Sequence, residues 1–418
     1  MSEVNASIIT IGDELLIGQT IDTNSAFISQ ELNKIGIWVK RRIAVGDDKK
    51  EILSALEQQR SGAEVIIITG GLGPTGDDIT KPVLCAYFGS QLMVNEEVLE
   101  NVKNIFKKFN RPLTERNIKQ ADVPDNCTVL MNERGTAPGM WFEKENTIYV
   151  SLPSVPHEMK GLMESAVIPR LKEQFSLPFI IHKTAVTVGQ AESALAEILN
   201  EWEEALPVHI KLAYLPHYRM VKLRLTARGE NKKELEQEIE KQFESLKSLV
   251  KEWMIADEDI SIVEVLGKLL DEKAKFMASA ESCTGGYIAH LLTSRSGSSS
   301  SFKGGVVSYA NEAKENALGV KQATLAKWGA VSEETSKEMV RGVLQLMNVD
   351  YAVATSGIMG PAGGTKEKPV GTVWITVADK NRIVSEKHFV HLDRKTNIEV
   401  TSLIALNMLR KFILEQEK

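Results

Sequence analysis

The stretch AESCTGG (residues 280–286) places two candidate nucleophiles, Ser282 and Cys283, side by side and follows them with two glycines. The residues before it, FMASA, are small and apolar and predict a strand, whereas GGYIAHLLTS has apolar side chains at helical spacing. Ser282 would therefore lie where a strand ends and a helix begins. Because a thiol ionises more readily than a hydroxyl, this stretch taken alone favours Cys283 as the reacting atom.

The residues that follow Ser282 supply backbone N–H groups to the same space. The first N–H groups of a helix have no partner within it, and they can stabilise the oxyanion that forms when a carbonyl carbon is attacked. Thr284 and Gly285 offer such groups, and the small Gly285 and Gly286 would let a substrate reach them. The competing interpretation is a helix cap made by Ser282 or Thr284, which is the commoner role of these residue types.

A base for the serine hydroxyl occurs in GSSSSFKGGVVSYANEAKENALGV (297–320), where Tyr309, Asn311 and Lys314 come just after a predicted strand. Asn311 is a candidate substrate-binding residue. A lysine that is partly removed from water loses its proton near neutral pH and can activate a hydroxyl. The sequence therefore predicts a pair of Ser282 and Lys314. A solvated helix residue is the competing interpretation of Lys314, since most lysines are exposed.

A Gly-rich turn, TSGIMGPAGGTKEKPVG (355–371), follows another predicted strand. Ser356 offers a hydroxyl to an acyl group there, and Gly357 allows close approach of a ligand. Arg394, further along the chain, offers a bidentate partner for a phosphate. A flexible surface hairpin is the alternative for the Gly-rich stretch.

The first third of the chain has two turns that combine glycine with acidic residues, IGDELLIG (11–18) and TGGLGPTGDDIT (69–80). Both follow apolar β-branched runs, so in a parallel sheet both lie at the edge where ligands bind. Glycines at such a junction let backbone N–H groups approach an anion. The candidate phosphate-binding residues are Gly71, Gly73, Thr75 and, at the end of a later strand, Ser151.

Three aspartates belong to these acidic turns, namely Asp13, Asp77 and Asp78. Their charges would repel a phosphate unless a divalent cation lay between the carboxylate and phosphate oxygens, which predicts metal-assisted phosphate chemistry. The competing interpretation is a pair of tight turns in which aspartates cap helices.

The composition of the 418 residues, 43% hydrophobic and 25% charged with a net charge of −6, is typical of a globular protein and disfavours a surface that grips nucleic acid throughout. No apolar run approaches the length of a membrane span, and the first residues do not resemble a secretory signal. Three widely spaced cysteines form neither a disulfide framework nor a zinc pattern. We therefore expect a cytoplasmic protein without a membrane segment.

The length predicts more than one domain. Strands alternate with helices over residues 1–175, which predicts an α/β domain with a parallel sheet covered on both faces. Residues 176–255 predict a small α+β domain, and residues 256–418 a second α/β domain.

Two sets of motifs resemble the competence/damage-inducible CinA family. GDELLIGQTIDTNS, TGGLGPTGDDIT and LPSVPHEMK resemble its N-terminal molybdopterin-binding-like domain, although Ser154 and Val155 depart from the family's LPGPPxEMK. AESCTGG, GSSSSFKGGVVSYANEAK, GAVSEET, SGIMGP and KPVGTVW resemble its C-terminal nicotinamide mononucleotide deamidase domain over nearly all of 261–418. The part between them fits the size and element order of the family's KH-like domain.

The resemblance implies two activities. Carried across by position, the nucleophile falls on Ser282 and the general base on Lys314, with Tyr309, Ser356 and Arg394 at supporting positions. They would hydrolyse nicotinamide mononucleotide to nicotinic acid mononucleotide and ammonia without a metal, and Cys283 would be a buried small residue. The N-terminal domain would split ADP-ribose into AMP and ribose 5-phosphate with a divalent metal ion (Co²⁺, Mg²⁺ or Mn²⁺), with or without K⁺.

The expected partners are these small nucleotides and a second copy of the chain in a homodimer. Nucleic-acid binding is not expected, because the net charge is negative and the KH-like part lacks the GXXG loop that clamps RNA. Two alternatives remain open: a non-catalytic nucleotide-sensing or competence-associated factor, and a molybdopterin-handling enzyme.

Overall fold

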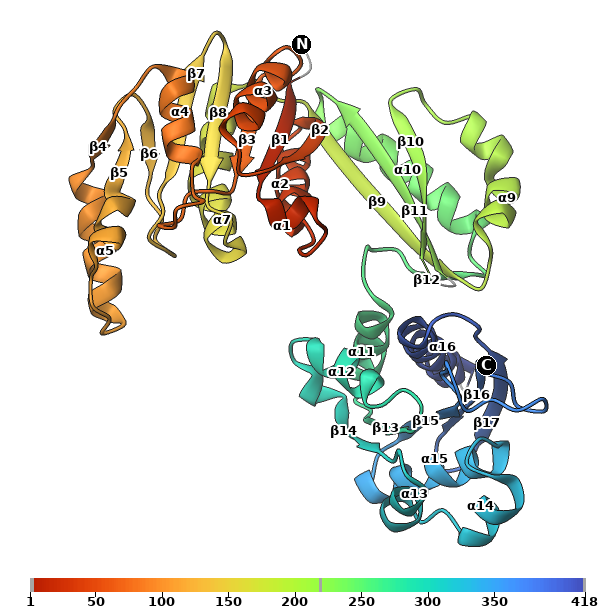
Figure 1. The fold of residues 1–418 in the computed structure, drawn as a ribbon. Helices are drawn as coiled ribbons and strands as arrows, with labels where there is room; N and C mark the ends of the chain where they lie inside the picture. The colour runs from red at the N-terminus through yellow and green to blue at the C-terminus, as the bar shows by residue number, and fades with distance from the viewer. Residues whose placement is uncertain (1–3, 218–219, 416–418) are drawn as a thin grey trace. The chain divides into compact units, whose positions relative to one another are not determined.

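The computed structural model describes residues 4–217 and 220–415 and contains three main β-sheets with helices packed on them (Figure 1). This is the mixed α/β, multidomain architecture that the sequence predicts. By compactness the chain divides into two units, one containing the first sheet and one the last, and the strands of the middle sheet are divided between them. The predicted limits of the three domains stay predictions.

The N-terminal sheet has the strand order β2-β1-β3-β8-β7-β6. Strands β2, β1, β3 and β8 are parallel, as the alternation of strands and helices predicts, and β7 is antiparallel to both β8 and β6. Glu145 and Asn146, both with positive φ, form a tight turn that joins β7 to β8 without a crossover helix. The strands are β1 (Asn5–Ile11), β2 (Trp38–Val45), β3 (Val65–Thr69), β6 (Thr128–Leu130), β7 (Gly139–Lys144) and β8 (Thr147–Leu152).

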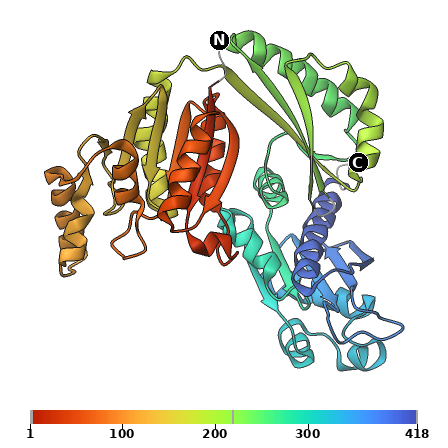
Figure 2. The ribbon, with the colours of Figure 1, turned by 45° about the horizontal axis from the view of Figure 1, so that its top comes forward.

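Helices cover both faces of this sheet (Figure 2). Successive strand residues face opposite sides, so Ile8 packs with α2, α7 and α8, whereas Ile9 packs with α3 and α4. A two-stranded ribbon of β4 (Leu92–Val94) and β5 (Asp122–Pro124) extends this part. The helices are α1 (Asp13–Leu16), α2 (Thr23–Lys34), α3 (Lys49–Arg60), α4 (Thr80–Phe88), α5 (Glu96–Lys108), α6 (Glu115–Ile118), α7 (Pro156–Leu162) and α8 (Ile168–Gln174).

The middle sheet has the order β10-β11-β9-β12. Helix α10 buries Leu235, Ile239, Phe243 and Leu246 at helical spacing and exposes most of its charged side chains, as its amphipathic sequence predicts. The elements are β9 (Phe179–Val188), α9 (Glu192–Glu204), β10 (Ile210–His217), β11 (Met220–Gly229), α10 (Lys232–Leu249) and β12 (Met254–Ala256).

The C-terminal sheet has the order β14-β13-β15-β16-β17, and its first three strands are parallel. Glu281, the last residue of β13, is level with Val307 of β14 and Thr355 of β15. The residues that follow these positions therefore meet at one edge of the sheet. The strands are β13 (Met277–Glu281), β14 (Phe302–Val307), β15 (Tyr351–Gly357), β16 (Thr372–Ala378) and β17 (Ile383–Phe389).

Two layers of helices enclose the C-terminal sheet. Helices α11, α12 and α16 pack on one face, and α13, α14 and α15 pack on the other. Strand β17 is missing from the strands that the sequence predicts, because this edge strand exposes Glu386 and Lys387. The helices are α11 (Ile262–Glu272), α12 (Tyr287–Ser294), α13 (Asn311–Leu318), α14 (Gln322–Trp328), α15 (Glu333–Met347) and α16 (Arg394–Leu414).

Across residues 4–217 and 220–415, no helix is both long enough and apolar enough to cross a membrane.

Candidate functional site

Ser282 lies in the turn between β13, which ends at Glu281, and α12, which begins at Tyr287. The predicted junction of strand and helix is therefore confirmed. Gly285 and Gly286 have φ values of +62° and +95°, which explains why glycines complete this turn. The Ser282 N–H donates to Thr355 O at 3.0 Å, which anchors the turn to β15.

A pocket of about 170 Å³ lies at this edge of the sheet. The five residues that the resemblance marks as catalytic all line it, although they come from distant parts of the chain. Its lining consists of Ser282, Cys283, Tyr309, Lys314, Ala330, Val331, Ser356, Gly357, Met359 and Arg394.

Lys314 is the buried cation of this pocket, with an exposed fraction of 1%. Its Nζ donates to Ser308 O at 2.7 Å and to Tyr309 O at 3.2 Å, and no carboxylate among the described residues pairs with it. Burial lowers the pKa of Lys314 below the usual 10.5. The lysine is therefore a better base near neutral pH than an exposed lysine would be.

Ser282 is 8% exposed, and within the described residues its Oγ makes no hydrogen bond. Serine and lysine thus share a pocket without being bonded to each other. Such bonds are often long or absent before substrate binds, so the arrangement remains compatible with proton transfer to Lys314.

Cys283 is also buried, and it packs in the apolar cluster between the sheet and α12. Burial raises the pKa of its thiol to about 12, so the thiol stays protonated at neutral pH. This finding favours Ser282 over Cys283 as the nucleophile.

Arg394 and Tyr309 form the polar rim of the pocket. Arg394 Nη1 donates to Gly360 O at 2.8 Å, and Nη2 donates to Tyr309 Oη at 3.0 Å. Tyr309 is 62% exposed. These contacts use only part of the guanidinium, so its further N–H groups can bind an anionic group of a substrate.

Ser356 is fully buried, and its Oγ donates to Ala330 O at 2.7 Å. Its hydroxyl hydrogen is therefore already used within the protein. The expectation that Ser356 donates a hydrogen bond to an acyl group does not match this geometry. The Ser356 hydroxyl instead fixes the Ala330 segment of the pocket wall, and its oxygen can still accept a hydrogen bond.

Of the two predicted oxyanion donors, the Gly285 N–H is already bonded within the protein, whereas the Thr284 N–H has no acceptor among the described residues. Gly285 N donates to Ser282 O at 3.2 Å and Gly286 N to Glu281 Oε2 at 3.0 Å, while the Thr284 side chain is 2% exposed and bonds Glu281. The physical reason is that the Glu281 carboxylate caps the start of α12. Among the described residues, the N–H groups of Cys283 and Thr284 have no acceptor.

Asn311 was expected to bind substrate, but it is exposed at the start of α13 and does not line the pocket. A different asparagine, Asn397, supports the chain around the pocket without lining it. The buried Asn397 donates from Nδ2 to Met359 O at 3.0 Å and to Leu392 O at 3.1 Å, and it accepts from Leu392 N. It thereby holds the chain on both sides of Arg394. The sequence signal for this role was the spacing: Asn397 follows Arg394 by about one helical turn, so the two residues lie on the same face of a predicted helix.

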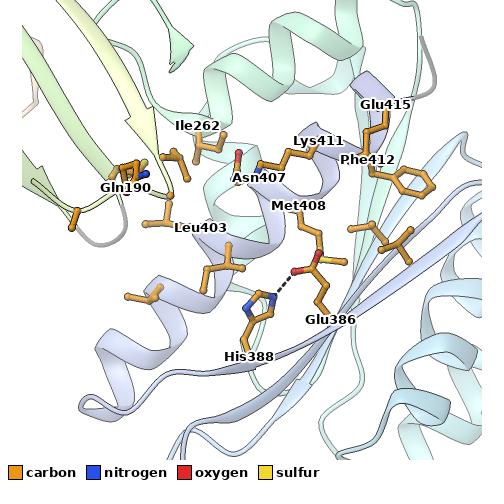
Figure 3. A pocket seen from close by; sticks show the side chains of 18 of the residues that line it. Gln190, Ile262, Glu386, His388, Leu403, Asn407, Met408, Lys411, Phe412 and Glu415 are labelled. Carbon is orange, nitrogen blue, oxygen red and sulfur yellow. Dashed lines mark ion pairs between the residues drawn. The ribbon is translucent and has the colours of Figure 1, made fainter. Parts of the chain in front are cut away.

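A second cavity, lined partly by α16 and β17, contains none of the predicted site residues (Figure 3). Met408 and Phe412 contribute apolar side chains to it, and His388 Nε2 lies 3.1 Å from a carboxylate oxygen of Glu386. It lacks a nucleophile paired with a base, so the chemistry expected of this domain belongs to the smaller pocket.

In the N-terminal part, the loops after β1, β2 and β3 lie at one edge of the sheet. Asp13 N donates to Asp47 Oδ2 at 3.1 Å, and Asp47 N donates to Asp13 Oδ1 at 3.2 Å, which ties the first two loops together. A side chain at Gly70 would come within 2.2 Å of Ile11 O, so the third loop packs against the first. The predicted meeting of the two acidic turns is confirmed.

The carboxylates at this edge do not form a closed metal site. Within residues 4–217 and 220–415, no three Asp, Glu, His or Cys side chains are grouped as metal ligands. Asp78 Oδ2 instead accepts from Thr75 N at 2.9 Å and Thr75 Oγ1 at 2.5 Å, which uses both polar groups of Thr75 that were expected to bind phosphate. The predicted group of Asp13, Asp77 and Asp78 is therefore not assembled.

Asp47, which the sequence analysis did not single out, belongs to the same edge. Burial raises its pKa above 3.8, and the charges of Asp13, Glu14 and Asp77 raise it further. These carboxylates thus lie within electrostatic reach of one another. This fits an open site in which a divalent cation takes one or two carboxylates and completes its coordination with substrate phosphates.

Gly71 and Gly73, the candidate phosphate-binding glycines of the third loop, allow close contacts within that loop. A Cβ at Gly71 would lie 2.3 Å from Thr80 Oγ1, and one at Gly73 would lie 2.4 Å from Asp78 Oδ2. Ser151 is fully buried in β8, and its Oγ has no partner among the described residues. The structure therefore does not expose Ser151 to a phosphate.

Lys81, at the start of α4, is 8% exposed, and its Nζ donates to Gln120 O at 2.8 Å. Burial lowers its pKa to about 8, although the nearby carboxylate of Asp122 opposes this shift. The ammonium group of Lys81 is therefore bonded to a backbone carbonyl inside the domain.

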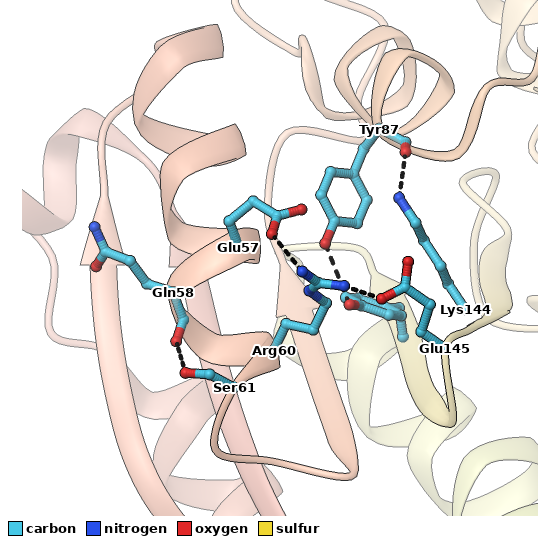
Figure 4. A network of polar contacts seen from close by, with 8 residues as sticks. Glu57, Gln58, Arg60, Ser61, Tyr87, Lys144 and Glu145 are labelled. Atoms are coloured by element: carbon cyan, nitrogen blue, oxygen red, sulfur yellow. Dashed lines mark hydrogen bonds and ion pairs between the residues drawn. The ribbon is translucent and has the colours of Figure 1, made fainter.

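The turn between β7 and β8 carries a polar network that joins α3, α4 and this turn (Figure 4). Arg60 pairs with Glu57 at 3.2 Å and with Glu145, and Lys144 Nζ donates to Tyr87 O at 3.1 Å. Because β8 begins here, this network lies at the opposite edge of the sheet from the acidic loops. It connects secondary-structure elements rather than forming a binding site.

Family models match three successive parts of the chain. Residues 7–173 match a probable molybdopterin binding domain, 182–256 the damage-inducible protein CinA KH domain, and 259–413 the CinA C-terminal domain. In solved structures, a competence/damage inducible protein CihA from Agrobacterium tumefaciens is 36% identical over 36% of this chain and 96% of its own, with a TM-score of 0.35.

Two curated relatives match the chain over nearly its whole length. A CinA-like protein of Flavobacterium psychrophilum is 48% identical over 414 residues, and one of Cytophaga hutchinsonii is 45% identical over 414 residues. Each alignment covers 99% of both chains. Three domain matches in order and this identity over the whole length place the chain in the CinA family.

Proposed function

We propose that the C-terminal domain hydrolyses the carboxamide of nicotinamide mononucleotide with Ser282 as nucleophile and Lys314 as base. The observation that carries this proposal is the pocket itself, which brings a serine, a desolvated lysine and a rim arginine together from separate elements. The identity of the substrate comes from the motif resemblance, and the chemistry of the pocket supports it.

In the first step, neutral Lys314 Nζ takes the proton of Ser282 Oγ, and the oxygen attacks the carboxamide carbon. The N–H groups of Cys283 and Thr284, which lack acceptors in the described structure, are the candidate donors to the developing oxyanion. When the C–N bond breaks, Lys314 returns the proton and ammonia leaves, with the acyl group on Ser282. Water then attacks the ester, its proton passes through Lys314 to Ser282, and nicotinic acid mononucleotide is released.

The size of the pocket limits which part of the substrate it encloses. Small-molecule pockets usually measure about 300–1,000 Å³, whereas this one measures about 170 Å³. It would therefore hold the ring and the carboxamide, and the ribose phosphate would lie at the rim. Arg394 is a cation at that rim and suits the phosphate.

A second activity is proposed for the N-terminal part, namely hydrolysis of the diphosphate of ADP-ribose. The supporting observation is the pair of Asp13 and Asp47, which bond to each other's backbone across two loops at the edge of a sheet whose neighbouring loops are rich in glycine. These carboxylates would hold a divalent cation together with the diphosphate. Such a cation, when bound, would polarise the phosphoryl group and offset its charge.

Ammonia release from nicotinamide mononucleotide tests the main proposal, with the full chain, Ser282→Ala and Cys283→Ala. We expect the serine variant to lose at least about 10³-fold in kcat and the cysteine variant to change little. Full activity in Ser282→Ala contradicts the proposal, and loss only in Cys283→Ala transfers the nucleophile to the thiol. Binding of the nucleotide by the wild type without ammonia release would favour a nucleotide-sensing role.

A further inference from the structure

Glu281 is the residue directly before the candidate nucleophile, and its carboxylate is fully buried. It accepts five hydrogen bonds, all from residues of the same stretch of chain. Oε1 accepts from Ser279 Oγ at 3.1 Å and Ala289 N at 2.8 Å; Oε2 accepts from Thr284 Oγ1 at 2.8 Å, Gly286 N at 3.0 Å and Ile288 N at 3.0 Å.

These donors flank Ser282 on both sides, because Ser279 precedes it in β13 and the other four follow it. One carboxylate therefore fixes the strand end, the turn and the first turn of α12 relative to each other. A charged acceptor makes stronger hydrogen bonds than a neutral one, and it also offsets the positive end of the helix dipole. Burial within the domain keeps water from competing for these donors.

The same bonds decide which N–H groups remain for a substrate. Glu281 occupies those of Gly286, Ile288 and Ala289, so the start of α12 is not open to an anion. The N–H groups of Cys283 and Thr284 remain without an acceptor in the described chain. They lie in the turn that Glu281 fixes, next to Ser282.

We propose that Glu281 is a positioning residue for deamidation: it fixes the turn so that Ser282 Oγ and the N–H groups of Cys283 and Thr284 face one substrate carbonyl. This inference rests on the proposed function, but it concerns a residue for which the sequence motifs gave no role. Glu281 itself does not line the pocket.

The variant Glu281→Gln tests this role. The amide keeps the size of the side chain, but its NH₂ group would face backbone N–H donors that need an acceptor. We expect kcat for ammonia release to fall about 10²-fold, the scale of a small misplacement of reacting groups, with KM nearly unchanged. A buried residue that only stabilised the fold would lower the amount of active protein without this loss per folded molecule.

A matched control exists in the same domain. Glu264 caps α11 and accepts from Ser261 N at 2.9 Å and Ser261 Oγ at 3.1 Å, away from the pocket. Glu264→Gln makes the same chemical change at another helix start, and we expect it to leave kcat unchanged. An equal loss of kcat in both variants, or a change in KM alone in Glu281→Gln, would overturn the proposal.

Hydrogen exchange of the full-length proteins separates this inference from the proposed activity. In Glu281→Gln, the peptide covering residues 282–289 should exchange at least about tenfold faster than in wild type, while Glu264→Gln should leave it unchanged. If the wild type releases no ammonia, the proposed function fails. If the peptide exchanges equally fast in Glu281→Gln and in wild type, the role of Glu281 in fixing the turn fails, whatever the activity. Should Glu281→Gln not fold, Ser279→Ala removes one donor and keeps the charge; it should lower kcat about threefold.

Discussion

The C-terminal pocket and the N-terminal acidic edge each contain a buried lysine beside a Gly-rich turn, but the two lysines differ in what surrounds them. Lys314 lines a pocket with Ser282, and no carboxylate among the described residues pairs with it. Lys81 donates to Gln120 O, and Asp122 and Asp78 raise its pKa against the effect of burial. Burial lowers the pKa of both lysines, and Lys314 shares its pocket with the hydroxyl of Ser282.

The difference shows two ways of preparing a site. The C-terminal pocket is preorganised, because the protein interior has already fixed the serine turn, the lysine and the arginine. The N-terminal edge presents carboxylates that accept hydrogen bonds from the backbone of the acidic loops, so its chemistry depends on what a cation and a diphosphate would assemble. The first arrangement predicts sensitivity to single substitutions, and the second predicts sensitivity to metal removal.

The largest effect is expected from Lys314→Met, which keeps the length of the side chain and removes the base. General-base catalysis contributes about 10²- to 10⁴-fold, so kcat should fall by about 10³-fold. Lys314→Arg should not restore activity, because the guanidinium stays protonated. The buried charge is gone in the methionine variant, so its thermal stability should not fall; activity close to wild type would contradict the base assignment.

The pH dependence of deamidation sharpens the same assignment. Lys314 is a base only when neutral, and its neutral form is populated above its pKa. Because burial lowers this pKa below 10.5, kcat/KM should rise with pH through a midpoint below that of an exposed lysine. A rate that stays flat across this range would show that another group takes the proton.

Substitution of Lys81 should change the free energy of unfolding rather than the enzymatic activity. Its folded pKa of about 8 lies below the unfolded 10.5, so between these values the unfolded chain binds more protons and stability rises with pH. Below about pH 8 both states are protonated, and the burial penalty is fully present at about 3 kcal/mol. Lys81→Met should therefore raise the melting temperature at pH 7 in calorimetry, whereas the exposed Lys119→Met should not. A lower melting temperature for Lys81→Met would contradict this account.

The N-terminal edge is tested by Asp78→Ala and by chelation, both measured as release of AMP from ADP-ribose. Losing Asp78 frees Thr75 and loosens the third loop, so cleavage should fall about 10²-fold, and a chelator should abolish it. Deamidation of nicotinamide mononucleotide should continue in both cases. Diphosphate cleavage that survives both treatments would end the metal hypothesis, and a parallel loss of deamidation would show that the two sites are not independent.

The sequence predicted the place of both sites because parallel strands end at the same edge of a sheet, so the motifs after β13, β14 and β15 had to meet. It could not predict hydrogen bonds within the turns. Ser356 and Thr75 had the right chemistry for a ligand, but Ala330 O and the Asp78 carboxylate are nearer partners. Glu281 was part of the quoted motif, and only the fold shows that its side chain turns back to cap α12.

Tyr309→Phe should give the smallest effect and shows how much of the C-terminal site depends on its exposed rim. The change removes one acceptor of Arg394, but the bond to Gly360 O remains, and Tyr309 is 62% exposed to competing water. We expect KM for nicotinamide mononucleotide to rise about threefold with kcat nearly constant, since a single hydrogen bond of this kind is worth about 1 kcal/mol. Arg394→Lys, which removes the planar fork, should raise KM further. If Tyr309→Phe instead lowered kcat as strongly as Lys314→Met, the tyrosine hydroxyl would take part in proton transfer. The preorganised catalytic groups would then include a residue of the exposed rim.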